Sequence, residues 1–203
     1  MDSRITKTIS EYNRIAEGYT KENNSEEIVS SMAPLLDKFI EYIEEGKDIL
    51  DVGCGHGRDS KYFSENEFNV TAVDLSEELL SIAKKISPKA NFMLMDMRNL
   101  SFQDNSFDGL WACASFLHVP KEFAKGTLSG FYNALKPEGL LFLCVKEGEY
   151  EGFMKSNSYG GCERYFSNYT LDELENLLSS SGFEMIELVI DDKFINTYSR
   201  AKK

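Results

Sequence analysis

Short apolar segments alternate with amphipathic segments along most of the chain. The apolar segments cover residues 48–52, 68–73, 91–95, 107–113 and 140–145. Each is rich in large apolar residues and closes at a turn or a polar residue, which is typical of strands buried on both faces of a parallel sheet. The pattern therefore predicts five parallel strands.

Helix signals lie before and between these strands. Ser76 is placed to cap a helix whose first turn carries two glutamates, and Pro120 is placed to open another. Thr170 to Glu173 has the form of a capping box, and its helix should end by Gly182. Pro34, followed by an apolar stripe, predicts a helix that begins there.

The last part of the chain changes pattern. Residues 183–190 and 194–199 read as two strands joined by a turn at 191–193, which makes them an antiparallel hairpin. We therefore predict one domain over residues 1–203, with a doubly wound, mostly parallel, seven-stranded Rossmann-like α/β sheet and a C-terminal antiparallel hairpin. A ligand site is expected beyond the carboxyl ends of the strands.

Composition limits the classes of partner that we expect. The 34 acidic residues outnumber the 22 basic ones, giving a formal charge of −12, which disfavours nucleic acid and anionic membranes. The longest apolar run, 140–145, is far shorter than the ~20 residues that cross a bilayer. The four cysteines form no CxxC pair, so we expect reduced thiols in a cytoplasmic protein with no metal site.

A glycine-rich loop follows the first strand, reading Asp-Val-Gly-Cys-Gly-His-Gly-Arg over residues 51–58. Its spacing differs from the dinucleotide motif, and no Gly-Lys-Ser/Thr follows it. At about 6 Å and an effective dielectric near 20, each pairing of Asp51 with a phosphate charge would cost about 3 kcal/mol. The loop therefore favours a ligand that carries an ammonium group over a pyrophosphate.

Two further carboxylates end the next strands. Asp74 stands 21 residues after Gly53, where an acidic side chain can accept hydrogen bonds from a ribose diol. Asp96 can accept from an exocyclic amino group, and Met97 beside it can pack on a base. The three strand ends together indicate an adenosine joined to a cationic group without phosphate.

This combination resembles the class I (seven-β-strand) S-adenosylmethionine-dependent methyltransferases over nearly the whole chain. The matching segments are residues 49–57, 73–76, 96–97, 106–108 and 135–140. The resemblance implies S-adenosylmethionine as cofactor and a set of cofactor-binding residues: Asp51, Gly53, Cys54 and Gly55 for the methionine moiety, Asp74 for the ribose, Leu75, Asp96 and Met97 for the adenine, and Ser115 near the methionine amino group.

The N-terminal segment 12–19 resembles the Y-[DN]-x-x-A-x-x-Y segment with which many small-molecule members cover the cofactor. The resemblance makes Tyr12 and Tyr19 cofactor contacts and makes residues 1–45 a helical cap over the site. Simple packing of the two tyrosines within a helix is the alternative.

Methyl transfer is an in-line displacement, so alignment of the reacting groups supplies most of the catalysis. An oxygen or nitrogen acceptor also needs a proton removed, for which His118, Tyr19 and Glu147 are candidates. A hydrogen-bonded structural role is the alternative for His118. His56, between two glycines of the loop, is expected to face solvent.

The predicted acceptor rim consists of Lys146 and Glu147, after the fifth strand, and Arg164 and Tyr165, before the last helix. Two cations placed there against the overall negative charge favour a small acceptor with an anionic or polar group. The alternative is that Arg164 pairs with a neighbouring glutamate on the surface.

The function that these patterns favour is methyl transfer to oxygen or nitrogen of a small molecule. Two alternatives stay open: a non-catalytic regulatory protein that binds S-adenosylmethionine or S-adenosylhomocysteine, and a methyltransferase acting on protein or RNA. A nicotinamide oxidoreductase is disfavoured by the glycine loop. The sequence identifies neither the acceptor nor the oligomeric state.

Overall fold

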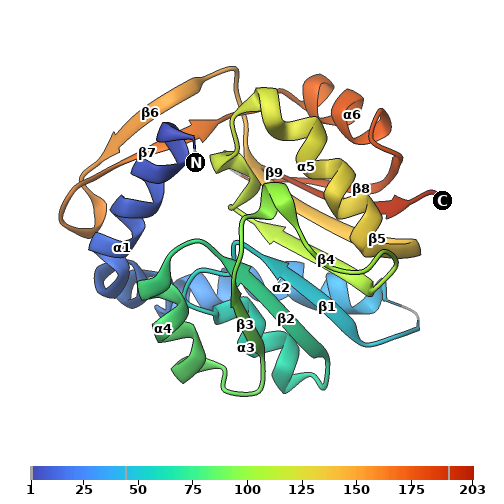
Figure 1. The fold of residues 1–203 in the computed structure, drawn as a ribbon, viewed down its shortest axis with the longest axis horizontal. Helices are drawn as coiled ribbons and strands as arrows, with labels where there is room; N and C mark the ends of the chain where they lie inside the picture. Colours follow the sequence, from blue (N-terminus) through green and yellow to red (C-terminus); the bar gives the residue numbers. More distant parts are fainter. Residues whose placement is uncertain (1, 44, 192) are drawn as a thin grey trace.

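A seven-stranded sheet forms the centre of the computed structural model, which describes residues 2–43, 45–191 and 193–203. Figure 1 shows the strands running in order β3-β2-β1-β4-β5-β9-β8. Strands β1 to β5 pair in parallel, and β9 is antiparallel to both β5 and β8. The bounds are β1 Asp48–Val52, β2 Asn69–Asp74, β3 Asn91–Leu94, β4 Phe107–Cys113, β5 Leu135–Lys146, β8 Phe183–Asp191 and β9 Phe194–Ala201.

The predicted fold class is therefore confirmed, including the C-terminal hairpin of β8 and β9. Within the predicted turn at 191–193, Asp192 lies outside the described residues. Val52 is the register partner of Val73, and Asp74 that of Leu94, so β1, β2 and β3 end at one edge of the sheet. That edge carries the three predicted carboxylates.

Helices cover both faces of the sheet. Packing on one face involves α5 (Lys121–Ala134) and α6 (Leu171–Ser179), and packing on the other involves α2 (Glu26–Glu41) and α3 (Arg58–Glu65). The remaining helices are α1 (Ser3–Asn23) and α4 (Glu77–Ile86), and three short 3₁₀ turns are η1 (Met97–Asn99), η2 (Phe116–His118) and η3 (Ser158–Gly160). The buried residues form one cluster on each face of the sheet, which is the layered arrangement expected of a doubly wound fold.

The predicted caps are present, with one correction. The Ser76 hydroxyl accepts from the Leu79 N–H, and Thr170 and Glu173 form both bonds of a capping box. The predicted start of a helix at Pro34 is wrong, because α2 begins at Glu26, where Ser25 caps it, and Pro34 lies inside. A proline inside a helix removes one backbone hydrogen bond. Packing of the buried α2 residues on the sheet holds the helix together across that point.

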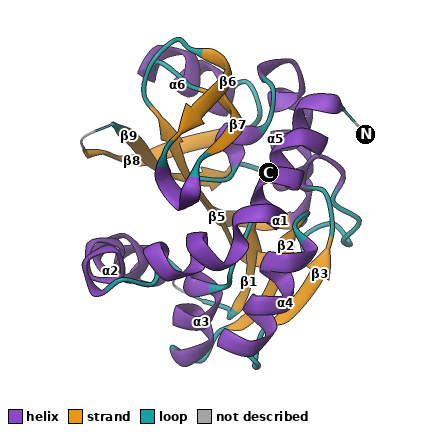
Figure 2. Cartoon of the chain, turned by 90° about the vertical axis from the view of Figure 1, so that its left-hand side faces the viewer, coloured by secondary structure: helices purple, strands orange, loops and turns teal. Residues whose placement is uncertain are grey.

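A second, two-stranded sheet was not anticipated. Strands β6 (Glu151–Ser156) and β7 (Cys162–Ser167) follow β5 and precede α6 in the chain, and they pair in antiparallel fashion. This β6–β7 hairpin lies against α1 at the carboxyl edge of the main sheet, as Figures 1 and 2 show. From here on, 'the cap' without further qualification means α1 together with the β6–β7 hairpin.

The predicted helical cap, residues 1–45, contains two helices, and its Met1 and Glu44 lie outside the described residues. The two helices do different things. Helix α1 contacts β7, η3 and α4, whereas Phe39 of α2 packs on Trp111 and Phe142 of the sheet. Only α1 lies over the carboxyl edge.

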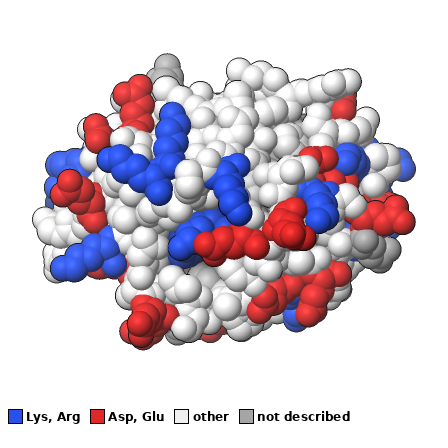
Figure 3. Space-filling model, turned by 90° about the horizontal axis from the view of Figure 1, so that it is seen from below, with Lys and Arg blue, Asp and Glu red and all other residues white. Residues whose placement is uncertain are grey.

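The surface and the helices add two observations. Acidic and basic side chains are interspersed on the face shown in Figure 3. Among the described residues, no helix combines the length and the apolar character needed to cross a bilayer.

Candidate functional site

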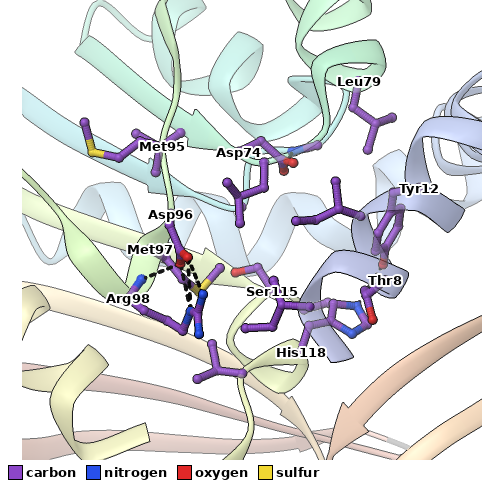
Figure 4. A pocket seen from close by; sticks show the side chains of 18 of the residues that line it. Thr8, Tyr12, Asp74, Leu79, Met95, Asp96, Met97, Arg98, Ser115 and His118 are labelled. Carbon is purple, nitrogen blue, oxygen red and sulfur yellow. Dashed lines mark hydrogen bonds and ion pairs between the residues drawn. The ribbon is translucent and has the colours of Figure 1, made fainter. Parts of the chain in front are cut away.

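A cavity opens where β1, β2 and β4 end and α1 crosses them. Its walls come from the strand ends and from one side of α1 (Figure 4). Ten of the predicted site residues line it: Tyr12, Tyr19, Gly53, Gly55, Asp74, Leu75, Asp96, Met97, Ser115 and His118.

The glycine loop lines one side of the cavity with backbone atoms. Gly53 and Gly55 have φ values of +71° and +54°, which only glycine adopts without strain. A Cβ atom on Gly53 would lie 2.3 Å from the Cβ of Ser115. Ser115 is fixed there because its hydroxyl donates to the Val52 carbonyl at 2.6 Å. A side chain at position 53 would therefore disrupt the contact between two strand ends.

Asp74 is held at the end of β2 by two backbone donors. The N–H groups of Gly55 and Ser76 each donate to one of its carboxylate oxygens at 2.8 Å. Burial raises the pKa of this carboxyl group above its usual value. Each oxygen keeps a second acceptor site, so the carboxylate can still accept hydrogen bonds from two ligand hydroxyls.

Asp96 makes an ion pair that sequence reasoning missed. Arg98 donates to its carboxylate through Nη2 at 2.5 Å and through Nε at 3.1 Å. Both side chains line the cavity beside Met95 and Met97. The spacing Asp-Met-Arg was visible in the sequence, and a pair two residues apart after a strand was a usable signal. The pair leaves Asp96 with fewer free acceptor sites than Asp74.

A smaller polar cavity adjoins the first. Tyr19, Gly53, Gly55 and Cys113 line both, while Asp51, Cys54, His56, Arg58 and Asp59 line only the smaller one. It holds a dense group of charges at the start of α3.

Within that group, Asp51 forms no ion pair with any residue that the structure describes. It accepts from the Ser60 hydroxyl at 2.5 Å, whereas Arg58 pairs with Asp59, which also accepts from the indole N–H of Trp111. Burial and the nearby Asp59 charge raise the pKa of Asp51. A ligand cation would relieve both effects, so the smaller cavity suits an ammonium group.

His56 corrects a second expectation. It is buried, its Nε2 lies 3.1 Å from the side-chain oxygen of Asn24, and its ring meets the edge of Tyr19. Burial lowers its pKa to about 4. The prediction of a solvent-facing residue was wrong because the end of α1 covers this part of the glycine loop.

A hydrogen-bonded chain joins the cap to the sheet. His118 Nδ1 lies 2.5 Å from the Tyr165 carbonyl, which can only accept, so Nδ1 carries the proton. Burial lowers the pKa of His118 to about 3, so its other nitrogen, Nε2, is an acceptor. The Tyr12 hydroxyl, 2.8 Å away, donates to it and in turn accepts from Arg164 Nη1 at 2.8 Å. The lone pair that a general base would use is therefore occupied by Tyr12.

The four predicted acceptor residues line neither cavity. Lys146 and Arg164 both lie over the ring of Phe166. Tyr165 projects from the opposite side of β7, over Phe153 and Arg4, and Glu147 is exposed. The structure thus brings two of the four together.

Comparison with known proteins points to one family. Residues 49–139 match the family described as methyltransferase domain. The chain is 38% identical over 107 residues to a Bacillus subtilis protein named as a methyltransferase (YqeM), covering 50% of this chain and 43% of that protein. It is 34% identical over 108 residues to the 2-methyl-6-phytyl-1,4-hydroquinone methyltransferase of Synechocystis, covering 50% and 33%. The chain therefore spans less than half the length of both relatives.

Among solved structures, the 1,6-didemethyltoxoflavin-N1-methyltransferase of Burkholderia thailandensis superposes with a TM-score of 0.75. The match covers all of this chain and 92% of that one, at 19% sequence identity. That enzyme was crystallised with 1,6-didemethyltoxoflavin and S-adenosylhomocysteine. The likeness establishes a shared fold.

Proposed function

We propose that the chain is a class I S-adenosylmethionine-dependent methyltransferase and that it transfers the cofactor's methyl group to an oxygen or nitrogen atom of a small molecule. The match of residues 49–139 to the methyltransferase domain family supports the family assignment. The observation that carries the proposal is the set of three carboxylates, Asp51, Asp74 and Asp96, at the ends of β1, β2 and β3 around two adjoining cavities. One carboxylate is suited to each polar part of the cofactor: ammonium, ribose diol and adenine amino group.

The residues present fit this cofactor. Gly53 and Gly55 line the cavity with backbone, where a ligand can approach closely, and Asp74 keeps acceptor sites for the ribose hydroxyls. Leu75, Met95 and Met97 line the apolar part of the cavity for the adenine. In the smaller cavity, Asp51 would hold the ammonium and Arg58 would hold the carboxylate of the methionine end.

When bound, the cofactor supplies a methyl group on a positively charged sulfur. Tyr19 lines both cavities, so its ring stands at their junction and shields that region from water. Its edge contacts with Tyr12, His56 and Tyr159 fix the ring in place. The contribution of these side chains is alignment and exclusion of water.

His118 and Tyr12 are the groups placed to move a proton. Because His118 is neutral and already accepts from Tyr12, a proton from the acceptor would pass to Tyr12 Oη as the Tyr12 proton passes to His118 Nε2. The exposed Glu147 has no such connection to the cavity. We also propose a cytoplasmic location, supported by the free thiols of the chain.

Two measurements test the proposal. In calorimetry, S-adenosylhomocysteine should bind in the micromolar range while NAD and ATP do not compete; tighter binding of NAD would refute the proposed cofactor. Incubation with methyl-labelled S-adenosylmethionine and a fractionated lysate should label a small molecule. Label on protein or RNA, or cofactor binding with no labelled product, would replace the proposal with one of the two alternatives.

A further inference from the structure

Two cationic side chains share one aromatic ring beside the cofactor cavity. Lys146 Nζ lies 4.3 Å from the centre of the Phe166 ring, and Arg164 Cζ lies 5.4 Å from the same centre. Lys146 ends β5 in the main sheet, and Arg164 belongs to the β6–β7 hairpin. The two charges thus come from different parts of the fold and meet at the boundary between sheet and cap.

Neither cation has an acidic partner among residues 2–43, 45–191 and 193–203. Glu163, the glutamate next to Arg164, pairs with Lys7 instead. The guanidinium of Arg164 lies over the rings of Tyr12 and Tyr159 as well as Phe166, and its one hydrogen bond goes to the Tyr12 hydroxyl. The surface pairing that was the alternative for Arg164 is therefore not what these residues form.

In the described residues, the N–H groups of Arg164 and the charge of Lys146 are not fully matched by acceptors or anions. Arg164 Nε is shielded from solvent and has no acceptor in the described residues. Lys146 has its pKa lowered by burial and by the charges of Arg164 and Lys193. Half-buried cations of a protein normally pair with an anion, and this protein carries a formal charge of −12. An oxyanion between the two would satisfy the spare N–H groups and cancel their repulsion.

The position suits an acceptor that reaches into the cavity. Arg164 is bonded to Tyr12, and Tyr12 lines the cavity together with His118. Lys146 follows the β5 residues that pair with the end of β4, whose Cys113 also lines the cavity. A molecule anchored between the cations would thus have its other end beside the Tyr12 hydroxyl.

We propose that Lys146 and Arg164 form a subsite for the oxyanion, carboxylate or phosphate, of a small methyl acceptor. That the bound molecule is a methyl acceptor rests on the proposed function, whereas the anion subsite itself rests on the geometry. Glu147 and Tyr165 do not belong to this subsite.

The test is an NMR titration of the ¹⁵N-labelled protein that follows the Arg164 Nε–H signal, assigned by its loss in Arg164→Lys or Arg164→Gln. Inorganic phosphate and acetate are the probes, each added at constant ionic strength against chloride, with and without S-adenosylhomocysteine. The expected result is a saturable shift with at least one of the two anions. Phosphate against acetate then distinguishes a phosphorylated from a carboxylated acceptor. The Nε–H signal of Arg98, which is paired with Asp96, is the internal reference and should not move.

Two variants separate a built subsite from nonspecific charge. Lys146→Met keeps an apolar chain over Phe166 and should weaken anion binding at least tenfold, with an unchanged affinity for S-adenosylhomocysteine. Lys84→Met, on an exposed part of α4, removes the same charge and should bind the anion as the wild type does. The inference is overturned if neither anion shifts the signal beyond the chloride reference, or if the two variants weaken binding equally. Anion binding without S-adenosylhomocysteine binding would refute the proposed function and leave the subsite standing.

Discussion

The carboxyl edge of β1 to β3 and the cap above it are built by different means. At the edge, the contacts that hold Asp74 are short in sequence: the two donors, Gly55 and Ser76, are 19 and 2 residues away. In the cap they span the chain. Tyr12 meets His118 across 106 residues and Arg164 across 152, and the Thr8 hydroxyl accepts from Tyr165 N–H across 157.

The difference separates two tasks. At the edge, the proposed binding groups are the glycine loop and the three carboxylates, whose positions follow from the ends of the strands. In the cap, the side chains lie on α1 and the β6–β7 hairpin, which are not strands of the main sheet, so they can be altered with little disturbance of that sheet. We infer that cofactor affinity belongs to the edge and acceptor choice to the cap, and the predictions below test that division.

The largest effect is expected for Gly53→Ala at the edge. The new Cβ would face Ser115 Cβ at 2.3 Å from a residue with φ of +71°. Strain of about 1–3 kcal/mol, concentrated in the cofactor cradle, should weaken S-adenosylhomocysteine binding by about a hundredfold. Calorimetry measures it, with Gly126→Ala as control, because a Cβ there meets nothing within 4 Å. Equal affinities for the two variants would show that the loop is not a cradle.

The next effect is expected for Asp74→Ala. It removes an acceptor for the ribose hydroxyls. A charge-assisted hydrogen bond is worth roughly 1.5–3 kcal/mol, so the net loss of one such bond should lower affinity for S-adenosylhomocysteine at least tenfold. Circular dichroism should show a retained fold. An unchanged affinity in the folded variant would mean that Asp74 only ties β2 to the glycine loop.

Local signals explain why the edge was predictable from sequence. The strands of the sheet appeared as apolar runs, and Ser76 and Thr170 act within one helical turn of themselves. Position on the sheet follows from strand order, so the placement of Asp51, Asp74 and Asp96 at one edge required no knowledge of packing.

The β6–β7 part of the cap was not predicted, because its contacts with α1 span most of the chain. Among the described residues, the β6–β7 hairpin pairs with no strand of the main sheet and is bonded instead to α1. Neither burial pattern nor connection length predicted it. His56 was misjudged for the same reason, since the residue that bonds it, Asn24, is 32 positions away. The prediction that a helix begins at Pro34 was wrong for a different reason. The local preference of proline for a helix start was overridden by the packing of α2 on the sheet.

Acid should loosen the cap through His118. Its pKa is about 3 in the fold against an ordinary 6.5, so the unfolded chain binds this proton first and stability falls as pH drops through 6.5 toward 3. Between pH 7 and pH 5 this group should cost about 2 kcal/mol of unfolding free energy. Denaturant titrations of wild type and His118→Asn at both pH values measure it. The difference in unfolding free energy between pH 7 and pH 5 should be smaller in the variant by that amount. An equal difference in wild type and variant would contradict a buried neutral ring.

The smallest effect is expected for Tyr12→Phe, which separates the two regions most cleanly. The ring contact with Tyr19 remains, but Arg164 Nη1 and His118 Nε2 lose their partner, so unfolding free energy should fall by about 1 kcal/mol. Affinity for S-adenosylhomocysteine should change less than about threefold, because the hydroxyl serves the cap and the edge is intact. Tyr62→Phe is the matched control, since it removes a hydroxyl bonded to Asp37 on the exposed side of α3. If Tyr12→Phe instead abolished cofactor binding at unchanged stability, the hydroxyl would belong to the cofactor site, and the division between edge and cap would have to be redrawn at α1.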